Sequence, residues 1–262
     1  MNNTGDLSFG VLGPLEVRLG NSPVPVRGWR ERSVLAMLLL ADGYTVPVER
    51  LVDAVWDGDP PGNALKAVRN CVSALRCRLA EAGAPAIPIE TAPAGYRLRI
   101  TTGGIRLDAR DFRRRVDDAR LLAAAGSAAG AASGLRAALA LWRGPTLDGT
   151  GGRIVRNYAE LLDEQRLSAM QDVIDLELAL GRHRQAVDEL RALAADHPVH
   201  EGIAGQLMLA LYRSGRQADA LHAYLRLAKR LAEDLGVDPT AEITRRYEAI
   251  LRHDPAAGLA LS

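Results

Sequence analysis

The stretch Asn63–Leu79, NALKAVRNCVSALRCRL, is the most informative part of this 262-residue chain. Its apolar residues recur at helical spacing, so we expect them to face the core of a domain. These residues are Leu65, Val68, Val72, Leu75 and Leu79. At about 100° per residue, Lys66, Asn70, Ser73 and Cys77 fall on the opposite side, with Arg69 and Arg76 at its flank. The stretch predicts an amphipathic helix with one buried face and one hydrogen-bonding face.

Two shorter helices are expected before this one. Apolar spacing predicts helices over residues 30–42 and 48–56, and the run Asp57-Gly58-Asp59-Pro60-Pro61-Gly62 predicts a sharp break after them. Residues 9–19 carry β-branched and apolar side chains interrupted by Gly13-Pro14, which favours a bent strand or a strand pair. A further short strand is expected over residues 23–26.

A β-hairpin is expected after the amphipathic helix. Residues 87–90 and 96–100 predict two strands, with Pro93 and Gly95 in the turn between them. In the second strand Tyr96, Leu98 and Ile100 alternate with Arg97 and Arg99, so one side packs on the domain and the arginines face outward. The run of threonine and glycine at residues 101–104 marks the expected edge of the domain.

The net charge of +1 conceals a local excess of positive charge. Between Pro61 and Ile100 six basic residues stand against only Glu81 and Glu90, which gives this part of the chain a charge of +4. A basic two-faced helix followed by a hairpin with outward arginines is the pattern of a nucleic-acid-binding module. The alternative interpretation is an ordinary surface helix with solvated charges.

The rest of the chain, from Asp108 onward, is expected to be helical, with low-complexity Ala, Gly and Ser at 123–134. An internal repeat occurs there with an offset of 34 residues, the period of tetratricopeptide units. Leu178, Gly181, Ala186, Val187 and Leu190 reappear as Tyr212, Gly215, Ala220, Leu221 and Tyr224. We expect antiparallel helix pairs in which each glycine ends the first helix.

Several classes of function are disfavoured. The chain has no glycine-rich phosphate loop, no HExxH and no GxSxG, and its five histidines are scattered, so we expect neither an enzyme nor a metal or cofactor site. Cys71 and Cys77 are six residues apart on one predicted helix and cannot pair, which fits a reducing cytoplasm. No export signal or membrane-spanning segment is apparent.

Several fragments in the same order resemble the Streptomyces antibiotic regulatory protein family. In the N-terminal part they are FGVLGPLEV at residues 9–17, VERLVDAVW at 48–56, Pro60-Pro61, Val72-Ser73, Leu75-Arg76 and Gly95-Tyr96. In the C-terminal part they are ALWRGP at residues 140–145, LMLALY at 207–212 and EDLGVDP at 233–239. The resemblance extends from about Leu7 to Leu251.

The resemblance implies an α+β winged helix-turn-helix domain of the OmpR type at residues 1–104. A bacterial transcriptional activation domain of tetratricopeptide-like helices is implied at 105–262. It also implies a short-form cytoplasmic activator, without receiver or ATPase module, for a secondary-metabolite (antibiotic) gene cluster. Such activators bind direct repeats of double-stranded DNA near the −35 element as a tandem pair, so a homodimer on DNA is expected. RNA polymerase, through its sigma or alpha subunit, is the expected partner of the loop that holds Asp57, Asp59 and Pro60.

The expected DNA contacts combine the residue patterns with this resemblance. Arginine pairs well with guanine and asparagine with adenine, whereas outward arginines on a hairpin suit phosphates. The candidate residues are Lys66, Arg69, Asn70, Ser73, Arg76, Arg78, Arg97 and Arg99.

This chain also departs from the family pattern. Family members usually carry arginine where this chain has Ala74, Cys77 and Ala92, and proline where it has Ala94. An alternative function is therefore a helical-repeat interaction scaffold with a degenerate DNA-binding module.

Overall fold

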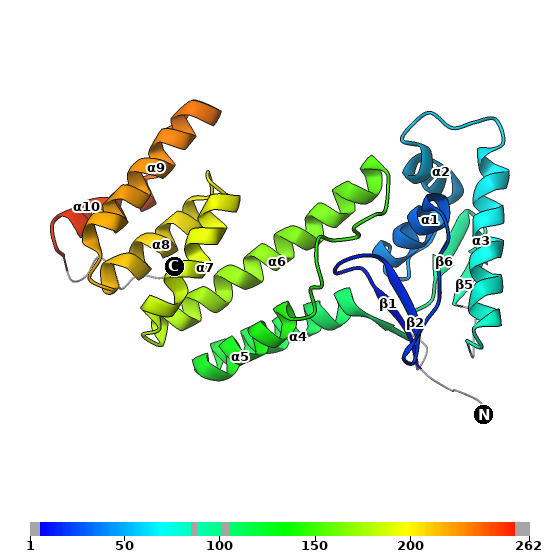
Figure 1. Ribbon diagram of the computed structural model, residues 1–262, viewed down its shortest axis with the longest axis horizontal. Coiled ribbons are helices and arrows are strands. Elements are labelled where there is room, and N and C mark those ends of the chain that lie inside the picture. Colours follow the sequence, from blue (N-terminus) through cyan, green and yellow to red (C-terminus); the bar gives the residue numbers. More distant parts are fainter. Residues whose placement is uncertain (1–5, 85–87, 101–104, 255–262) are drawn as a thin grey trace. The chain divides into compact units, whose positions relative to one another are not determined.

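The computed structural model describes residues 6–84, 88–100 and 105–254 (Figure 1). The chain forms two compact units, each described below by itself. Unit 1 comprises Met1–Asp117 and Ala137–Leu167, and unit 2 comprises Asp118–Arg136 and Ser168–Ser262.

Unit 1 contains two small β-sheets. The first has the strand order β3-β2-β1-β7, in which β1 pairs antiparallel with β2 and parallel with β7. The second has the order β4-β6-β5, and both of its pairings are antiparallel. The strands are β1 (Leu7–Gly10), β2 (Glu16–Leu19), β3 (Ser22–Pro23), β4 (Val46–Pro47), β5 (Ile89–Ala92), β6 (Gly95–Leu98) and β7 (Ile105–Leu107).

Three helices complete the N-terminal part of unit 1: α1 (Trp29–Leu40), α2 (Val48–Trp56) and α3 (Ala64–Glu81). Every residue of α1 from Ser33 to Leu39 is buried, so this helix lies at the centre of the unit. The predicted helices are confirmed, and the bounds predicted for α2 are those observed. Strands β5 and β6 lie beside α3, as Figure 1 shows.

One residue of the predicted apolar face of α3 was assigned wrongly. Val68, Val72, Leu75 and Leu79 are buried, but Leu65 is 49% exposed. Ala64, four residues before Val68 and therefore also on its side of the helix, is buried at the first position of α3 instead.

The strand pair predicted for residues 9–19 is confirmed as β1 and β2, and the hairpin is confirmed as β5 and β6. Tyr96, Leu98 and Ile100 are buried, whereas Arg97 and Arg99 face outward. Ile87 and the predicted domain edge at 101–104 lie outside the described residues.

Helices also dominate the remainder of the chain: α4 (Asp108–Ala124), α5 (Ala128–Leu139), α6 (Arg153–Ala179), α7 (His183–Asp196), α8 (Glu201–Arg213), α9 (Gln217–Leu235) and α10 (Ala241–Leu251). The boundary between the two units falls within α4, α5 and α6. Among the described residues, no helix combines the length and the apolar character that crossing a bilayer needs.

The expectation of continuous helix after Asp108 is wrong for residues 140–152, which form a long connection in unit 1. Gly144 and Pro145 interrupt helical geometry there. Backbone N–H groups of this segment pair with the β1–β2 turn instead of a helix. Arg143 N donates to Leu12 O over 2.7 Å, and Leu147 N donates to Val11 O over 3.1 Å.

The 34-residue repeat in unit 2 is confirmed as two helix pairs. Gly181 and Gly215 follow the ends of α6 and α8, with φ of 79° and 77°, a conformation that glycine adopts without strain. Ala186 and Ala220 are buried one turn into the next helices, α7 and α9. Helix α8 is the centre of unit 2, since Ile203–Leu211 is buried throughout.

Candidate nucleic-acid interface

The outer face of α3 carries four polar side chains with no partner within the described part of the chain: Lys66, Arg69, Asn70 and Ser73. All four are exposed, because the apolar side of α3 packs on the core and turns the other side outward. Residues three and four apart are neighbours on a helix, so the four form one continuous surface. We call this surface the α3 face.

The two cysteines lie on different sides of α3, as predicted. Cys71 is buried, and burial raises the pKa of its thiol. Cys77 is exposed near the C-terminal end of the helix, where its thiol donates to Glu81 Oε1 over 3.3 Å. That carboxylate raises the pKa of the Cys77 thiol, so the side chain stays neutral and adds no charge to this end of α3.

Arg76 is held against the hairpin and is only half-exposed. Its Nε donates to Ile89 O over 3.0 Å, and a terminal nitrogen donates to Thr91 Oγ1 over 2.9 Å. Its guanidinium also lies 5.8 Å from the centre of the Tyr96 ring. Arg76 therefore links α3 to β5 and β6, a role that the helical pattern did not reveal.

Replacing Arg76 by alanine is expected to lower the free energy of unfolding by about 1–2 kcal/mol, because a half-buried carbonyl loses its donor. Urea unfolding measures this loss, and faster amide exchange in β5 should accompany it. The matched control is Arg69→Ala, which removes an unpartnered arginine from the same helix and should leave stability unchanged. Equal stability of the two variants would contradict the linking role.

Arg78 does not join the α3 face. Its side chain is 23% exposed and forms an ion pair with Glu31 Oε1 over 3.0 Å. The structure thus brings four of the predicted α3 contacts together and places Arg78 against α1. Its contact with DNA stays a prediction.

Arg97 and Arg99 share one carboxylate across the hairpin. Arg97 Nε lies 2.7 Å from Glu90 Oε2, and Arg99 is paired with the other oxygen of the same group. Both arginine side chains remain 46% exposed, so they are accessible from solvent while Glu90 offsets part of their charge. Glu90 therefore sets how much positive charge the hairpin presents.

Glu90→Gln is expected to strengthen binding to duplex DNA of arbitrary sequence. Freeing one positive charge for a phosphate should steepen the slope of log K against log salt by ~0.9 and raise affinity ~3-fold near physiological salt. Anisotropy titrations at several salt concentrations measure both quantities. Asp117→Asn makes the same charge change at an exposed position of α4. An equal gain in that control would show that net charge, and not the hairpin, is responsible.

The loop after α2 is exposed at Asp57, Asp59 and Pro60. Asp57 has a left-handed conformation, with φ of 53°, and its carboxylate accepts the N–H of Arg153 over 2.6 Å. Arg153 is the first residue of α6, so Asp57 satisfies a free N–H at a helix start. Asp59 and Pro60 are the parts of the loop that remain available to a partner.

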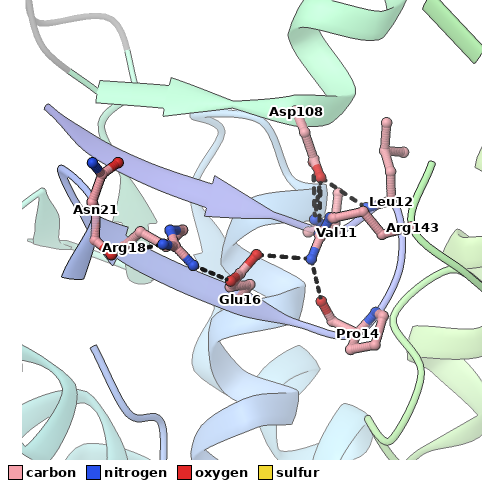
Figure 2. Close-up of polar contacts among 8 residues, drawn as sticks. All are labelled: Val11, Leu12, Pro14, Glu16, Arg18, Asn21, Asp108 and Arg143. Atoms are coloured by element: carbon pink, nitrogen blue, oxygen red, sulfur yellow. Dashed lines mark hydrogen bonds and ion pairs between the residues drawn. The ribbon is translucent and has the colours of Figure 1, made fainter. Parts of the chain in front are cut away.

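A further polar cluster fixes residues 140–152 to the β1–β2 turn (Figure 2). The Asp108 carboxylate accepts the N–H groups of Val11, over 2.9 Å, and Leu12, over 3.1 Å. Arg143 donates to Asp108 over 3.2 Å and to Glu16 over 2.9 Å, so it bridges two carboxylates. Burial raises the pKa of Asp108 and outweighs the opposing effect of these donors.

Glycines make room for this cluster. A Cβ at Gly13, where φ is 147°, would lie 2.9 Å from Arg143 Cβ. A Cβ at Gly10 would lie even closer to the Arg143 guanidinium. The turn at residues 10–14 is therefore the surface on which the connection between α5 and α6 packs. The local sequence pattern did not predict this contact.

Two family models match the chain. "Transcriptional regulatory protein, C terminal" matches residues 27–98, and "Bacterial transcriptional activator domain" matches residues 107–251. The matches confirm the predicted order of a winged helix followed by a helix-rich domain. The proposed boundary at residue 104 lies between the two matches, whereas compact unit 1 continues past it to Asp117 and also includes Ala137–Leu167.

The relatives are regulators of transcription. Regulatory protein DnrI of Streptomyces peucetius is 34% identical over 95% of this chain and 93% of its own length. Regulatory protein AfsR of Streptomyces coelicolor is 38% identical, but the chain spans only 25% of it. This chain also spans 64% of the length of the transcriptional regulatory protein EmbR of Mycobacterium tuberculosis.

A solved structure of EmbR from Mycobacterium tuberculosis has the same fold, with a TM-score of 0.87 and 37% identity over 97% of this chain and 68% of that one. With DnrI matched over nearly its whole length, these similarities identify the family. The chain belongs to the Streptomyces antibiotic regulatory protein family of transcriptional activators, which join an OmpR-type winged helix to a bacterial transcriptional activator domain.

Proposed function

We propose that this chain acts in the cytoplasm, where it binds promoter DNA through the α3 face and activates transcription of a secondary-metabolite (antibiotic) biosynthetic gene cluster. The observation that carries the proposal is the set of unpartnered donors on α3. An α-helix fits the major groove, where Arg69 suits guanine and Asn70 suits adenine. Lys66 and Ser73 suit either a base edge or a phosphate.

The hairpin supports the same mode of binding. Arg97 on β6 and Arg99 just after that strand are exposed and offer charge to the phosphate backbone. Phosphate contacts position a protein on the duplex without reading its sequence. Arg76 contributes by fixing the hairpin relative to α3, and its remaining N–H groups are further candidate donors.

The finer proposal concerns the assembly on DNA. Two copies bind direct repeats near the −35 element as a tandem pair, and each copy presents Asp59 and Pro60 to a sigma or alpha subunit of RNA polymerase. Exposure of these two residues supports the proposal, as does the fixed loop conformation that Asp57 and Arg153 maintain. The proposed domains are residues 1–104 for DNA and 105–262 for activation.

DNase I footprinting upstream of the genes that neighbour this one tests the proposal. We expect two protected repeats of equal length on one face of the duplex, with affinity that falls steeply as salt rises. Absence of salt-dependent protection would reject DNA binding and favour the interaction scaffold. Protection without stimulation in a reconstituted transcription assay would reject the polymerase contact alone.

A further inference from the structure

Unit 2 contains an open groove of about 390 Å³ among α7, α8 and α9. Its floor is aliphatic and includes Ala204 and Leu207 from α8 and Ala223 and Leu227 from α9. These residues are three or four positions apart within each helix, so each pair lies on one side of its helix. The groove is therefore built into the packing of the helix pairs and does not depend on a loop.

The rim of the groove is positively charged. Arg191 of α7 and Arg226 and Arg230 of α9 line it, and no aspartate or glutamate does so among the residues described. Arg230 lies 3.9 Å from Asp234, and both side chains are about half exposed, so this pair contributes little. The groove thus has an uncompensated excess of cationic donors.

Arg191 and Arg226 have no hydrogen bond or ion pair within the described ranges. Arg191 also lowers the pKa of Asp219, but the hydrogen bond from Arg216 to Asp219 is the larger cause of that shift. Asp219 Oδ2 accepts from Arg216 Nε over 2.7 Å, so its charge is already engaged. Two guanidinium groups beside an aliphatic floor are therefore free for a ligand.

His200 adds a neutral donor at the end of the groove. Its Nδ1 accepts the N–H of Ile203 over 3.4 Å, which leaves the proton of the neutral ring on Nε2. Burial, and then the neighbouring His197, lower the pKa of His200, so the ring is uncharged at neutral pH. The histidines contribute hydrogen bonding and shape, and the arginines contribute charge.

We propose that this groove binds an acidic peptide segment of a partner protein. The segment lies extended, with its carboxylates on Arg191, Arg226 and Arg230 and its apolar side chains on the aliphatic floor. Arg226 and Arg230 are one helical turn apart, about 6 Å, and side chains two residues apart in an extended peptide are separated by about 6.6 Å. Adjacent carboxylates of an alternating acidic and apolar sequence therefore match both arginines.

The composition of the groove favours a peptide over nucleic acid. A nucleic-acid strand gains from aromatic side chains on which bases stack, and the lining holds no Trp, Tyr or Phe among the described residues. An aliphatic floor is of no use to a phosphate backbone, but it buries the valine or leucine side chains of a peptide. This inference is independent of DNA binding by the α3 face.

Fluorescence anisotropy with the full chain and a fluorescein-labelled (Glu-Val)4 peptide tests the proposal. We expect saturable binding, which Arg226→Gln combined with Arg230→Gln weakens ~10-fold or more through loss of two charge-assisted contacts. The matched control is Arg245→Gln, which removes an exposed arginine of α10 outside the groove. It should bind like the unmodified chain. A (Gln-Val)4 peptide should not bind, and (Glu-Ser)4 should bind more weakly.

Three outcomes would overturn the proposal: no saturable binding of (Glu-Val)4, equal binding by the double variant, or equal binding of (Gln-Val)4. Displacement of the peptide by a 20-base-pair duplex of arbitrary sequence, lost in the double variant, would assign the groove to nucleic acid instead. Unchanged unfolding midpoints show that the variants fold. Footprinting with the double variant separates the two proposals, because operator binding should persist when peptide binding is lost.

Discussion

Replacing Arg69 and Asn70 together by alanine is expected to abolish sequence-specific binding to promoter DNA while the fold survives. Both side chains are exposed on α3 and have no partner in the described part of the chain, so their removal leaves no buried group unsatisfied. Each bidentate contact to a base is worth about 1–3 kcal/mol of discrimination, so the double variant should bind its operator at least ~30-fold more weakly. Footprinting and competition against a scrambled operator measure the loss.

Arg114→Ala is the matched control, because Arg114 is a well-exposed arginine of unit 1 that lies on α4. It should reduce operator affinity little and discrimination not at all. The single variants separate the two roles: Arg69→Ala should relax the preference for guanine at one position, and Asn70→Ala the preference for adenine at another. A double variant that footprints like the unmodified chain would show that α3 presents another face to DNA.

Local pattern was sufficient to predict the elements that lie close together in sequence. Helices α2 and α3 follow from apolar spacing and from the Asp57–Gly62 break, and the hairpin follows from alternation around Pro93 and Gly95. The 34-residue repeat could also be predicted from the sequence, since a glycine follows the end of the first helix in each repeat. Each of these signals involves residues within a few turns or one repeat of one another.

Pairings between distant segments were not predictable in this way. Strand β7 is three residues long and pairs in parallel with β1, which lies nearly a hundred residues earlier. The sequence around β7 therefore gives no indication of its partner strand. The same holds for residues 140–152, whose N–H groups pair with Val11 and Leu12. The glycines at positions 10 and 13 were the available clue, because glycine is required where another segment approaches closely.

In the candidate site, too, features of one helix were predicted from the sequence and contacts between elements were not. Helical projection identified the exposed set Lys66, Arg69, Asn70 and Ser73, because exposure depends on the angle around one helix. It did not identify the partners of Arg76 and Arg78, because these lie on the hairpin and on α1. Their long side chains reach across to neighbouring elements, and projection describes only where a side chain leaves its helix.

Replacing Asp108 by alanine is expected to lower the free energy of unfolding by about 2–4 kcal/mol, because two part-buried backbone N–H groups lose a charged acceptor. The Asp108 carboxylate satisfies the N–H groups of Val11 and Leu12 and is paired with Arg143. Its loss leaves two backbone donors without their acceptor, whereas the Arg143 guanidinium keeps its contact with Glu16. Urea unfolding followed by tryptophan fluorescence measures the effect, because all three tryptophans, Trp29, Trp56 and Trp142, belong to unit 1.

Asp108→Asn keeps the size of the side chain and one acceptor oxygen, so its loss should be intermediate. Asp117→Ala is the matched control, since Asp117 lies on the same helix but is exposed, and it should change stability by less than ~0.5 kcal/mol. A variant with Asp108→Ala that is as stable as this control would contradict the role of the cluster. Intermediate behaviour of Arg143→Ala would instead assign most of the stabilisation to the backbone N–H groups, which that variant leaves bonded to Asp108.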